Sequence, residues 1–356
     1  MRVVLAAHGT IRWLGVNKYF YLLGKYLARL GVDVDIIVDS PEGIRAAREV
    51  CGDSVYIVCL GPIATGVVST MRYCRNLARY LMRHSNFDIL HCGHVLPFFY
   101  LGELGRRPVV FQPFGNELFT LAGRGLNKWY CRVARRVLRY CAEHADVVVS
   151  EGAFQHKEMM QFYPDMKQLC VLPVGVETNG RVMCTRRESP VFTFLTVNSL
   201  LPYEGMDELI KAFKRVYQVI DCRLIIVGSG SEEGRLKKMS VSVPVEFRQG
   251  LSEAELRGMY LLASDAFVCT THETDMQMGV LEAMASGLPV ISRKADWLPD
   301  SIIQFGDYDL AEKMLSLVSK SAPNRTVVAE KGLEEVRQYS FTEIAAKALA
   351  IYEDLM

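Results

Sequence analysis

Short apolar runs of about four to seven residues recur along the chain, separated by longer segments in which apolar residues follow a helical period. This alternation is typical of βαβ units with parallel strands. The runs expected to form strands are 3–5, 35–38, 55–59, 89–91, 109–112, 147–149 and 170–172 in the first half, and 192–197, 223–227, 245–248, 266–269 and 290–292 in the second. The two halves therefore repeat one architecture, and the predicted fold class is α/β with two Rossmann-like domains.

The length of 356 residues exceeds what one ordinary hydrophobic core needs and indicates two domains. A polar, aperiodic stretch at 178–189 indicates where they join. The expected parts are a first domain at 1–173, a linker at 174–190, a second domain at 191–340 and a C-terminal helix at 341–356. That helix has one apolar face, which predicts that it crosses back to the first domain.

Composition narrows the class of protein further. Half of the residues are hydrophobic and 23% are charged, the balance of a folded globular chain. The apolar run before His8 is too short for a signal peptide or a membrane span, so we expect a cytoplasmic protein. The ten cysteines contain no C-x-x-C pair and are interpreted as small buried hydrophobes rather than disulfides or metal ligands.

The net charge of +1 conceals an asymmetry, because residues 1–173 hold 21 Lys and Arg against 14 Asp and Glu, whereas the remainder holds 20 against 26. Two helical segments of the first half carry basic stripes, namely Arg72, Arg75, Arg79 and Arg83, and Lys128, Arg132, Arg135 and Arg139. Such stripes favour peripheral contact with anionic headgroups at the cytoplasmic face of a membrane. An ordinary solvated helix face is the alternative. We predict no nucleic-acid partner.

In open parallel sheets, ligands bind beyond the carboxyl ends of the strands, where helix N-termini favour anions. The loop after the first strand offers Arg12 and Gly15 to a diphosphate. Gly228 and Gly230 follow another strand, but the third glycine of a dinucleotide fingerprint comes one place late, at Gly234. A nicotinamide-dependent oxidoreductase is therefore disfavoured.

The stretch 271–291 is the most informative one. Glu273 and Glu282 flank a turn that starts a helix, and Gly287 ends that helix before a buried strand. A carboxylate in such a place can accept hydrogen bonds from sugar or ribose hydroxyls, while backbone N–H groups face phosphate. The alternative is that Glu282 only caps or salt-bridges its own helix.

These motifs resemble those of the retaining glycosyltransferases of family four, the glycogen-synthase-like group with the GT-B fold. Residues 282–291 resemble the most recognisable signature of the family, and 173–177 resemble the segment that passes between its domains. Less specific resemblances occur at 224–230, 251–256, 260–268, 88–91 and 114–117. The resemblance implies two domains facing across a cleft, a nucleotide-sugar donor held mainly by the second domain, and no metal or other cofactor.

The resemblance also implies roles for individual residues. Glu282 is expected to hold the nucleotide ribose, and Glu273 or Asp275 to hold the donor sugar and stabilise positive character at its anomeric carbon. The other residues expected at the donor are Arg12, Gly15, Asn198, Ser199, Gly228, Thr274, Gln277, Met278, Gly279 and Arg293. The residues expected on the acceptor side are His94, Asn116 and Glu117.

The sequence departs from the family where the donor diphosphate binds. Relatives carry an Arg and a Lys near the first strand of the second domain, where Ser199 and Glu204 stand here. The first glutamate of the paired-Glu motif falls by count on Thr274, with Glu273 one residue earlier. Removing one such electrostatic donor typically costs roughly 3–4 kcal/mol of transition-state stabilisation. The cations expected to replace the missing pair are Arg12, Arg293 and Lys294.

We therefore predict an enzyme that moves a hexosyl group from a nucleotide sugar to a hydroxyl of a sugar, polyol or lipid-linked acceptor, with retention of configuration. The alternative is a weakly active or inactive descendant that binds a sugar nucleotide or a partner protein. Ser199 and Glu204 motivate that alternative.

Overall fold

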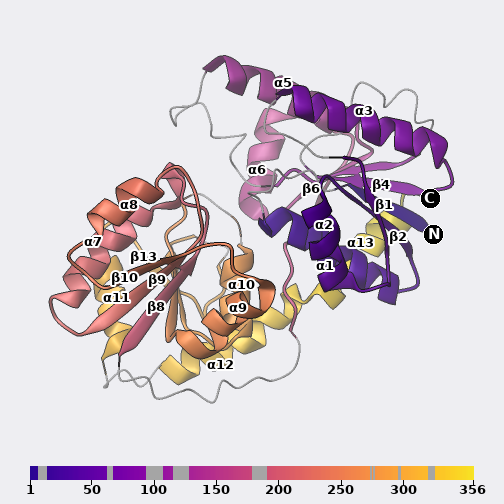
Figure 1. Cartoon of the computed structure of the whole chain (residues 1–356). Helices are drawn as coiled ribbons and strands as arrows, with labels where there is room; N and C mark the ends of the chain where they lie inside the picture. Colours follow the sequence, from indigo (N-terminus) through magenta and orange to yellow (C-terminus); the bar gives the residue numbers. More distant parts are fainter. Residues whose placement is uncertain are drawn as a thin grey trace. The chain divides into compact units, whose positions relative to one another are not determined.

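The computed structural model of the chain (Figure 1) describes residues 1–6, 14–61, 67–93, 107–114, 128–178, 191–272, 275, 277–295, 298–319 and 325–356. The chain forms two compact units. One consists of Met1–Gly175 together with Phe341–Met356, and the other of Val176–Ser340. The division after Gly175 falls within the segment 174–190.

The first unit is built on a seven-stranded sheet with the order β3-β2-β1-β4-β5-β6-β7, in which every pair of neighbours is parallel. Its strands are β1 (Arg2–Ala6), β2 (Asp33–Val38), β3 (Tyr56–Cys59), β4 (Ile89–Cys92), β5 (Val109–Phe111), β6 (Val147–Ser150) and β7 (Leu169–Val171). The apolar runs of β1, β2, β4, β5 and β6 are buried, as is typical of the central strands of a parallel sheet, whereas β3 and β7 form its more exposed edges.

Helices cover both faces of this sheet. They are α1 (Leu14–Arg29), α2 (Pro41–Cys51), α3 (Val67–Arg83), α5 (Lys128–His144), α6 (Ala153–Phe162) and α13 (Phe341–Glu353). One face packs against α3, α5 and α6. On the other, α13 lies against α1, with the rings of Tyr26 and Phe341 stacked at 5.9 Å and His91 Nδ1 2.6 Å from the Tyr352 hydroxyl. The last helix thus belongs to the first unit.

The second unit has a six-stranded parallel sheet with the order β10-β9-β8-β11-β12-β13. Its strands are β8 (Phe192–Val197), β9 (Cys222–Val227), β10 (Val245–Arg248), β11 (Ala266–Cys269), β12 (Val290–Arg293) and β13 (Ile303–Phe305). Its helices are α7 (Met206–Tyr217), α8 (Glu233–Met239), α9 (Glu253–Gly258), α10 (Met278–Ala285), α11 (Leu310–Val318) and α12 (Arg325–Glu335). The core between the sheet and α7, α8 and α11 is apolar, and the prediction of two parallel α/β sheets is confirmed.

Two local predictions differ from the structure. The three-residue strand Ile303–Phe305 was not expected, because so short a run carries no periodicity of its own. Gly15 was expected in a loop, but α1 begins at Leu14, so Gly15 lies in the first helical turn. No side chain would clash there, since a β-carbon at Gly15 would have no atom within 4 Å.

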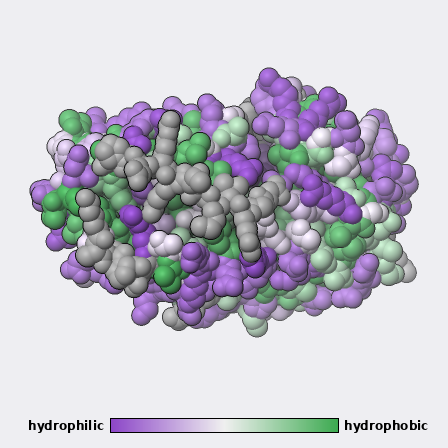
Figure 2. All heavy atoms as spheres, turned by 90° about the horizontal axis from the view of Figure 1, so that it is seen from below, coloured by the Kyte–Doolittle hydropathy of each residue, from purple (hydrophilic) through white to green (hydrophobic). Residues whose placement is uncertain are grey.

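On the face shown in Figure 2, hydrophobic residues are interspersed with hydrophilic ones. Among the described residues, no helix is both long enough and apolar enough to cross a membrane.

Candidate functional site

The connections of the second sheet change direction between β8 and β11. The chain builds outward from β8 through β9 and β10, then returns to add β11, β12 and β13 on the other side. The loops that follow two neighbouring strands diverge at such a switch point, and parallel α/β sheets bind ligands there. Asn198 follows β8 and Thr270 follows β11, so these residues open the candidate site.

Three glycines let the surrounding loops pack backbone against backbone. A β-carbon at Gly228 would lie 1.8 Å from the backbone oxygen of Asn198, and one at Gly230 would lie 2.2 Å from that of Leu200. Gly228 and Gly205 have φ angles of 150° and 68°, which residues with a side chain rarely adopt. Gly228, expected at the donor, therefore has a packing role that needs no ligand.

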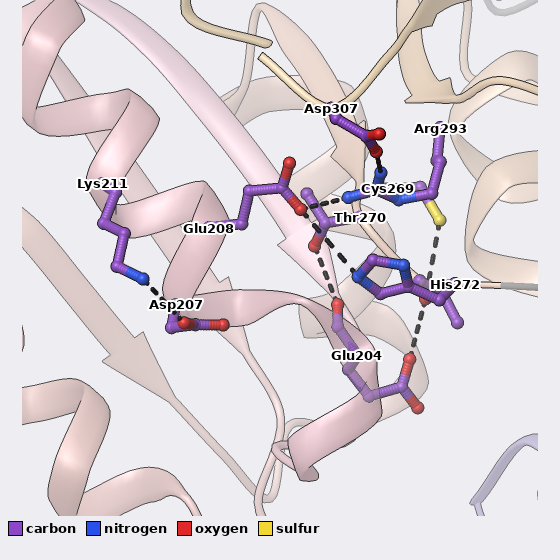
Figure 3. A network of polar contacts seen from close by, with 10 residues as sticks. Glu204, Asp207, Glu208, Lys211, Cys269, Thr270, His272, Arg293 and Asp307 are labelled. Carbon is purple, nitrogen blue, oxygen red and sulfur yellow. Dashed lines mark hydrogen bonds and ion pairs between the residues drawn. The ribbon is translucent and has the colours of Figure 1, made fainter.

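The buried carboxylate of Glu204 joins the same loops (Figure 3). Glu204 is only 5% exposed. Ser199 Oγ donates to Glu204 Oε1 at 2.7 Å, and Asn198 Nδ2 and Thr271 Oγ1 donate to Oε2, each also at 2.7 Å. The Thr270 hydroxyl donates to the backbone oxygen of Glu204 at 2.8 Å. Because hydrogen bonds to a charged acceptor are shorter and stronger than neutral ones, Glu204 fastens the loop after β8 to the loop after β11.

This network extends to the N-terminus of α10. Gln277 is the N-cap residue of the helix, and Thr271 Oγ1 lies 3.4 Å from Gln277 Oε1. Met278 and Gly279 follow, and the first N–H groups of a helix have no partner within it. A β-carbon at Gly279 would lie 3.2 Å from a backbone oxygen of β8, so the start of the helix is packed tightly on the sheet. The N–H groups and the helix dipole together favour an anion at this end.

Glu282 lies in the second turn of α10 and is partly exposed. Because Gln277 is the N-cap, Glu282 does not cap its own helix. The Tyr260 hydroxyl, from the π-helical turn Met259–Ala263, is buried beside the Glu282 carboxylate and lies 3.5 Å from where a β-carbon of Gly279 would be. Burial, and then the Glu282 charge, raises the pKa of Tyr260 well above its usual value. The hydroxyl has no hydrogen-bond partner among the described residues, so its proton is available to Glu282 beside it.

Arg293, expected to neutralise a diphosphate, is engaged by two carboxylates (Figure 3). Its guanidinium pairs with Glu208 of α7 and with Asp307, the latter at 3.2 Å, and lies over the ring of Phe305. The Arg293 side chain is 14% exposed. Burial raises the pKa of Glu208, against the lowering effect of Arg293. Since the Arg293 charge is already balanced, this residue offers less to a bound anion than an unpaired cation would.

His272, in the loop after β11, lies close to the same cluster. Its Nε2 is 4.0 Å from Glu208 Oε2, and its side chain is 42% exposed. The exposed Lys294 follows β12 directly. The residues Thr271, Glu208 and Tyr260 were not singled out from the sequence. Only Thr271 carried a usable signal, namely its place two residues after a buried strand.

The structure brings together Asn198, Ser199 and Gln277 through Glu204 and Thr271. Asp275 is 6% exposed. Six predicted site residues lie outside the described part of the chain, namely Arg12, His94, Asn116, Glu117, Glu273 and Thr274.

In the first unit, polar side chains are buried where β4 and β5 end. His91 and Gln112 are fully buried there, beside the Tyr19 hydroxyl. Burial lowers the pKa of His91 to about 3, so its ring is neutral at physiological pH. Because His91 contacts Tyr352 of α13, its role in the described structure is to hold the last helix on the sheet.

Comparisons with known proteins match both halves of the chain. Residues 15–175 match the model of the glycosyl transferase 4-like domain, and residues 186–317 match that of glycosyl transferases group 1. Over 96% of its length the chain is 24% identical to D-inositol 3-phosphate glycosyltransferase of Corynebacterium aurimucosum, and it covers 91% of that protein. Over 48% of its length it is 30% identical to GDP-mannose-dependent alpha-(1-6)-phosphatidylinositol monomannoside mannosyltransferase of Mycobacterium tuberculosis, and it covers 49% of that protein.

Among solved structures, sucrose-phosphate synthase from Thermosynechococcus elongatus matches with a TM-score of 0.78 at 16% identity. The match covers 100% of this chain and 99% of the synthase. At this identity the likeness shows the fold.

Proposed function

Because the chain belongs to the GT-B glycosyltransferases of the GT4 type, we propose that it transfers a hexosyl group from a nucleotide sugar to a hydroxyl group with retention of anomeric configuration. One observation carries this proposal. Asn198, the buried Glu204 carboxylate and the N-terminus of α10 meet at the switch point of the second sheet, where main-chain N–H groups can receive a diphosphate.

Glu282 accepts hydrogen bonds from the nucleotide ribose, for which its partial exposure beside the α10 N-terminus is suited. Glu273 or Asp275 holds the hydroxyls of the donor sugar and stabilises positive character at the anomeric carbon. The N–H groups of Met278 and Gly279, at the start of α10, face the diphosphate. No metal or other cofactor takes part.

The acceptor in this proposal is a sugar, a polyol or a lipid-linked molecule with a free hydroxyl. Two relatives support it by their names, since one glycosylates D-inositol 3-phosphate and the other a phosphatidylinositol monomannoside. On the acceptor side, His94, Asn116 and Glu117 remain the predicted contacts.

The proposal is tested by incubating the full chain with uridine, guanosine and adenosine diphosphate sugars and a panel of polyol, sugar and lipid-linked acceptors. Release of nucleoside diphosphate that depends on both donor and acceptor is expected. Proton NMR of the product should show the same anomeric configuration as the donor, and an inverted product would contradict retention.

The competing candidate is a chain that binds a sugar nucleotide without turnover. Ser199 and Glu204 motivate it, because neither side chain offers a positive charge to the leaving diphosphate. Saturable binding of a sugar nucleotide without diphosphate release, under every acceptor, would favour this candidate over the enzyme.

A basic surface of the first unit supports a membrane-facing acceptor. Arg72, Arg75, Arg79 and Arg83 are exposed along α3, and none forms an ion pair with another described residue. On α5, Arg139 by contrast is paired with Glu143 and Asp165. We extend the proposal to peripheral binding of anionic lipid through α3, where each basic residue near the surface contributes about 1 kcal/mol.

Vesicle flotation tests this extension. The wild-type chain should float with phosphatidylserine-containing vesicles at low salt, and Arg75→Glu/Arg79→Glu should not. The matched control, Lys238→Glu/Arg257→Glu, makes the same charge change at exposed positions of the second unit and should still float. Equal flotation of both variants, or none by the wild type, would remove the membrane proposal.

A further inference from the structure

The geometry around Glu204 points to a further role at the proposed donor site. We propose that Glu204 is a positioning residue, whose buried carboxylate sets the two loops and the helix start that receive the donor. It acts through Asn198 and Thr271. This inference rests on the proposed function, because it assigns the order of these loops to donor binding.

Hydrogen bonds from two loops converge on the Glu204 carboxylate. Both oxygens of Glu204 are used, and three donors from two different loops lie at 2.7 Å from them. A second hydrogen bond, from Asn198 Nδ2 to Thr271 Oγ1 at 2.7 Å, closes a triangle with Glu204 Oε2. In this triangle the Thr271 hydroxyl accepts from Asn198 and donates to Glu204, which fixes its orientation.

The main chain next to Glu204 also contacts the loop after β11. Glu204 ends the 3-10 turn Pro202–Glu204, and the next residue is Gly205 with a φ of 68°. A β-carbon at Gly205 would lie 2.5 Å from the backbone oxygen of Thr270. The turn therefore contacts the residues after β11 through its backbone as well as through the Glu204 carboxylate (Figure 3).

Thr271 connects Glu204 to the start of α10. Its hydroxyl donates to Glu204, and its Oγ1 lies 3.4 Å from Oε1 of Gln277, the N-cap residue of α10. Cys269 Sγ lies 3.3 Å from the same Gln277 oxygen and donates to it. Glu282 lies on the same helix. A change at Glu204 is thus transmitted to the helix end that faces the donor.

The chemistry of the network distinguishes the possible replacements. In Glu204→Gln, the amide oxygen can replace Oε2 and still accept from Asn198 and Thr271. The amide nitrogen then replaces Oε1 and donates to the Ser199 hydroxyl, which turns to accept. Leucine at 204 has a similar size but leaves Asn198 and Thr271 without their acceptor. Buried donors left unsatisfied are costly, so the loops must rearrange.

The experiment compares Glu204→Leu and Glu204→Gln with the wild type in steady-state kinetics on the full chain. The donor KM should rise at least tenfold for Glu204→Leu and less than threefold for Glu204→Gln, with the acceptor KM unchanged in both. Asp207→Asn removes an exposed ion pair with Lys211 from the neighbouring helix turn and is the matched control, with unchanged constants. If Glu204 only stabilises the fold, Glu204→Leu will lower the melting temperature and leave the donor KM unaltered. That result would overturn the inference.

If Glu204→Leu does not fold, Thr271→Val replaces it, because valine keeps the shape and removes the hydroxyl between Glu204 and Gln277. Hydrogen exchange gives a readout that does not need turnover. Backbone amides in peptides that cover α10 should exchange faster in the variant than in the wild type. Equal exchange would contradict the positioning role of Glu204. A wild type that binds no sugar nucleotide would instead defeat the proposed function, whatever the exchange data show.

Discussion

Replacing Gly228 with alanine tests how tightly the loops of the donor site are packed. The new β-carbon would lie 1.8 Å from the Asn198 oxygen, whereas β-carbon contacts under 3.0 Å essentially do not occur. The backbone of Asn198 must therefore move by about 1 Å or more, and interiors packed this closely resist such shifts. The φ of 150° adds strain, because alanine rarely adopts it.

The size of the effect follows from these two terms. An unfavourable backbone region costs roughly 1–3 kcal/mol, and overpacking typically costs a further ~1–3 kcal/mol. The expected loss in the free energy of unfolding is thus about 2–6 kcal/mol, equivalent to a fall of about 4–24 °C in melting temperature for a unit of this size. Donor binding should weaken as well, because Asn198 moves.

Gly234→Ala is the matched control, at the third glycine of the same segment. Gly234 lies in α8, and a β-carbon there would have no atom within 4 Å. Alanine in a helix is favoured over glycine, so this variant should gain about 0.5–1 kcal/mol. Thermal unfolding followed by circular dichroism measures both. The reasoning is refuted if Gly228→Ala melts within a degree of the wild type, or if both alanines destabilise equally.

Three further predictions concern buried polar groups. Tyr260→Phe removes the hydroxyl beside Glu282. Calorimetry should then show nucleoside diphosphate binding that is about two- to tenfold weaker, the range of one hydrogen bond, with little change in melting temperature. Unchanged affinity would count against this prediction. Burial lowers the pKa of His91 from 6.5 to about 3, so at acidic pH the unfolded chain binds a proton there that the native chain does not. The contribution of His91 to the free energy of unfolding is therefore complete above pH 6.5, and up to about 1.4 kcal/mol of it is lost per pH unit as the pH falls towards 3. Denaturant titrations of the wild type and His91→Gln should therefore converge on acidification, and parallel curves would disprove this. Finally, Ser199→Arg/Glu204→Lys restores two cations but places donors against the Asn198 amide, so diphosphate release should fall below that of the wild type; a rise would mean that missing charge, rather than loop order, limits turnover.

Most of the strands could be predicted from the sequence, because apolar residues dominate the central strands of a parallel sheet and alternate with charged ones in the edge strand at 245–248. The runs 192–197, 245–248 and 266–269 coincide with β8, β10 and β11. The short β13 was missed, since its three residues form a strand only because β12 lies beside them.

The contacts between side chains within the site could not be predicted from the sequence. Asn198 and Gln277 were both expected at the donor, because of the family resemblance. The contact between Glu204 and Thr271 joins residues 67 positions apart and depends on how β11 pairs with β8. The pairing of Arg293 with Glu208, 85 positions apart, depends in the same way on tertiary packing. No local pattern contains such information.

Calorimetric titration of the wild type and Glu282→Ala with uridine, guanosine and adenosine diphosphate sugars tests the central claim most directly. Glu246→Ala, at an exposed carboxylate paired with Arg248, is the control. The account predicts one-to-one binding of at least one of these donors by the wild type and the control, and affinity at least tenfold weaker for Glu282→Ala. Binding that is equally strong in Glu282→Ala, or no binding by the wild type, would contradict it.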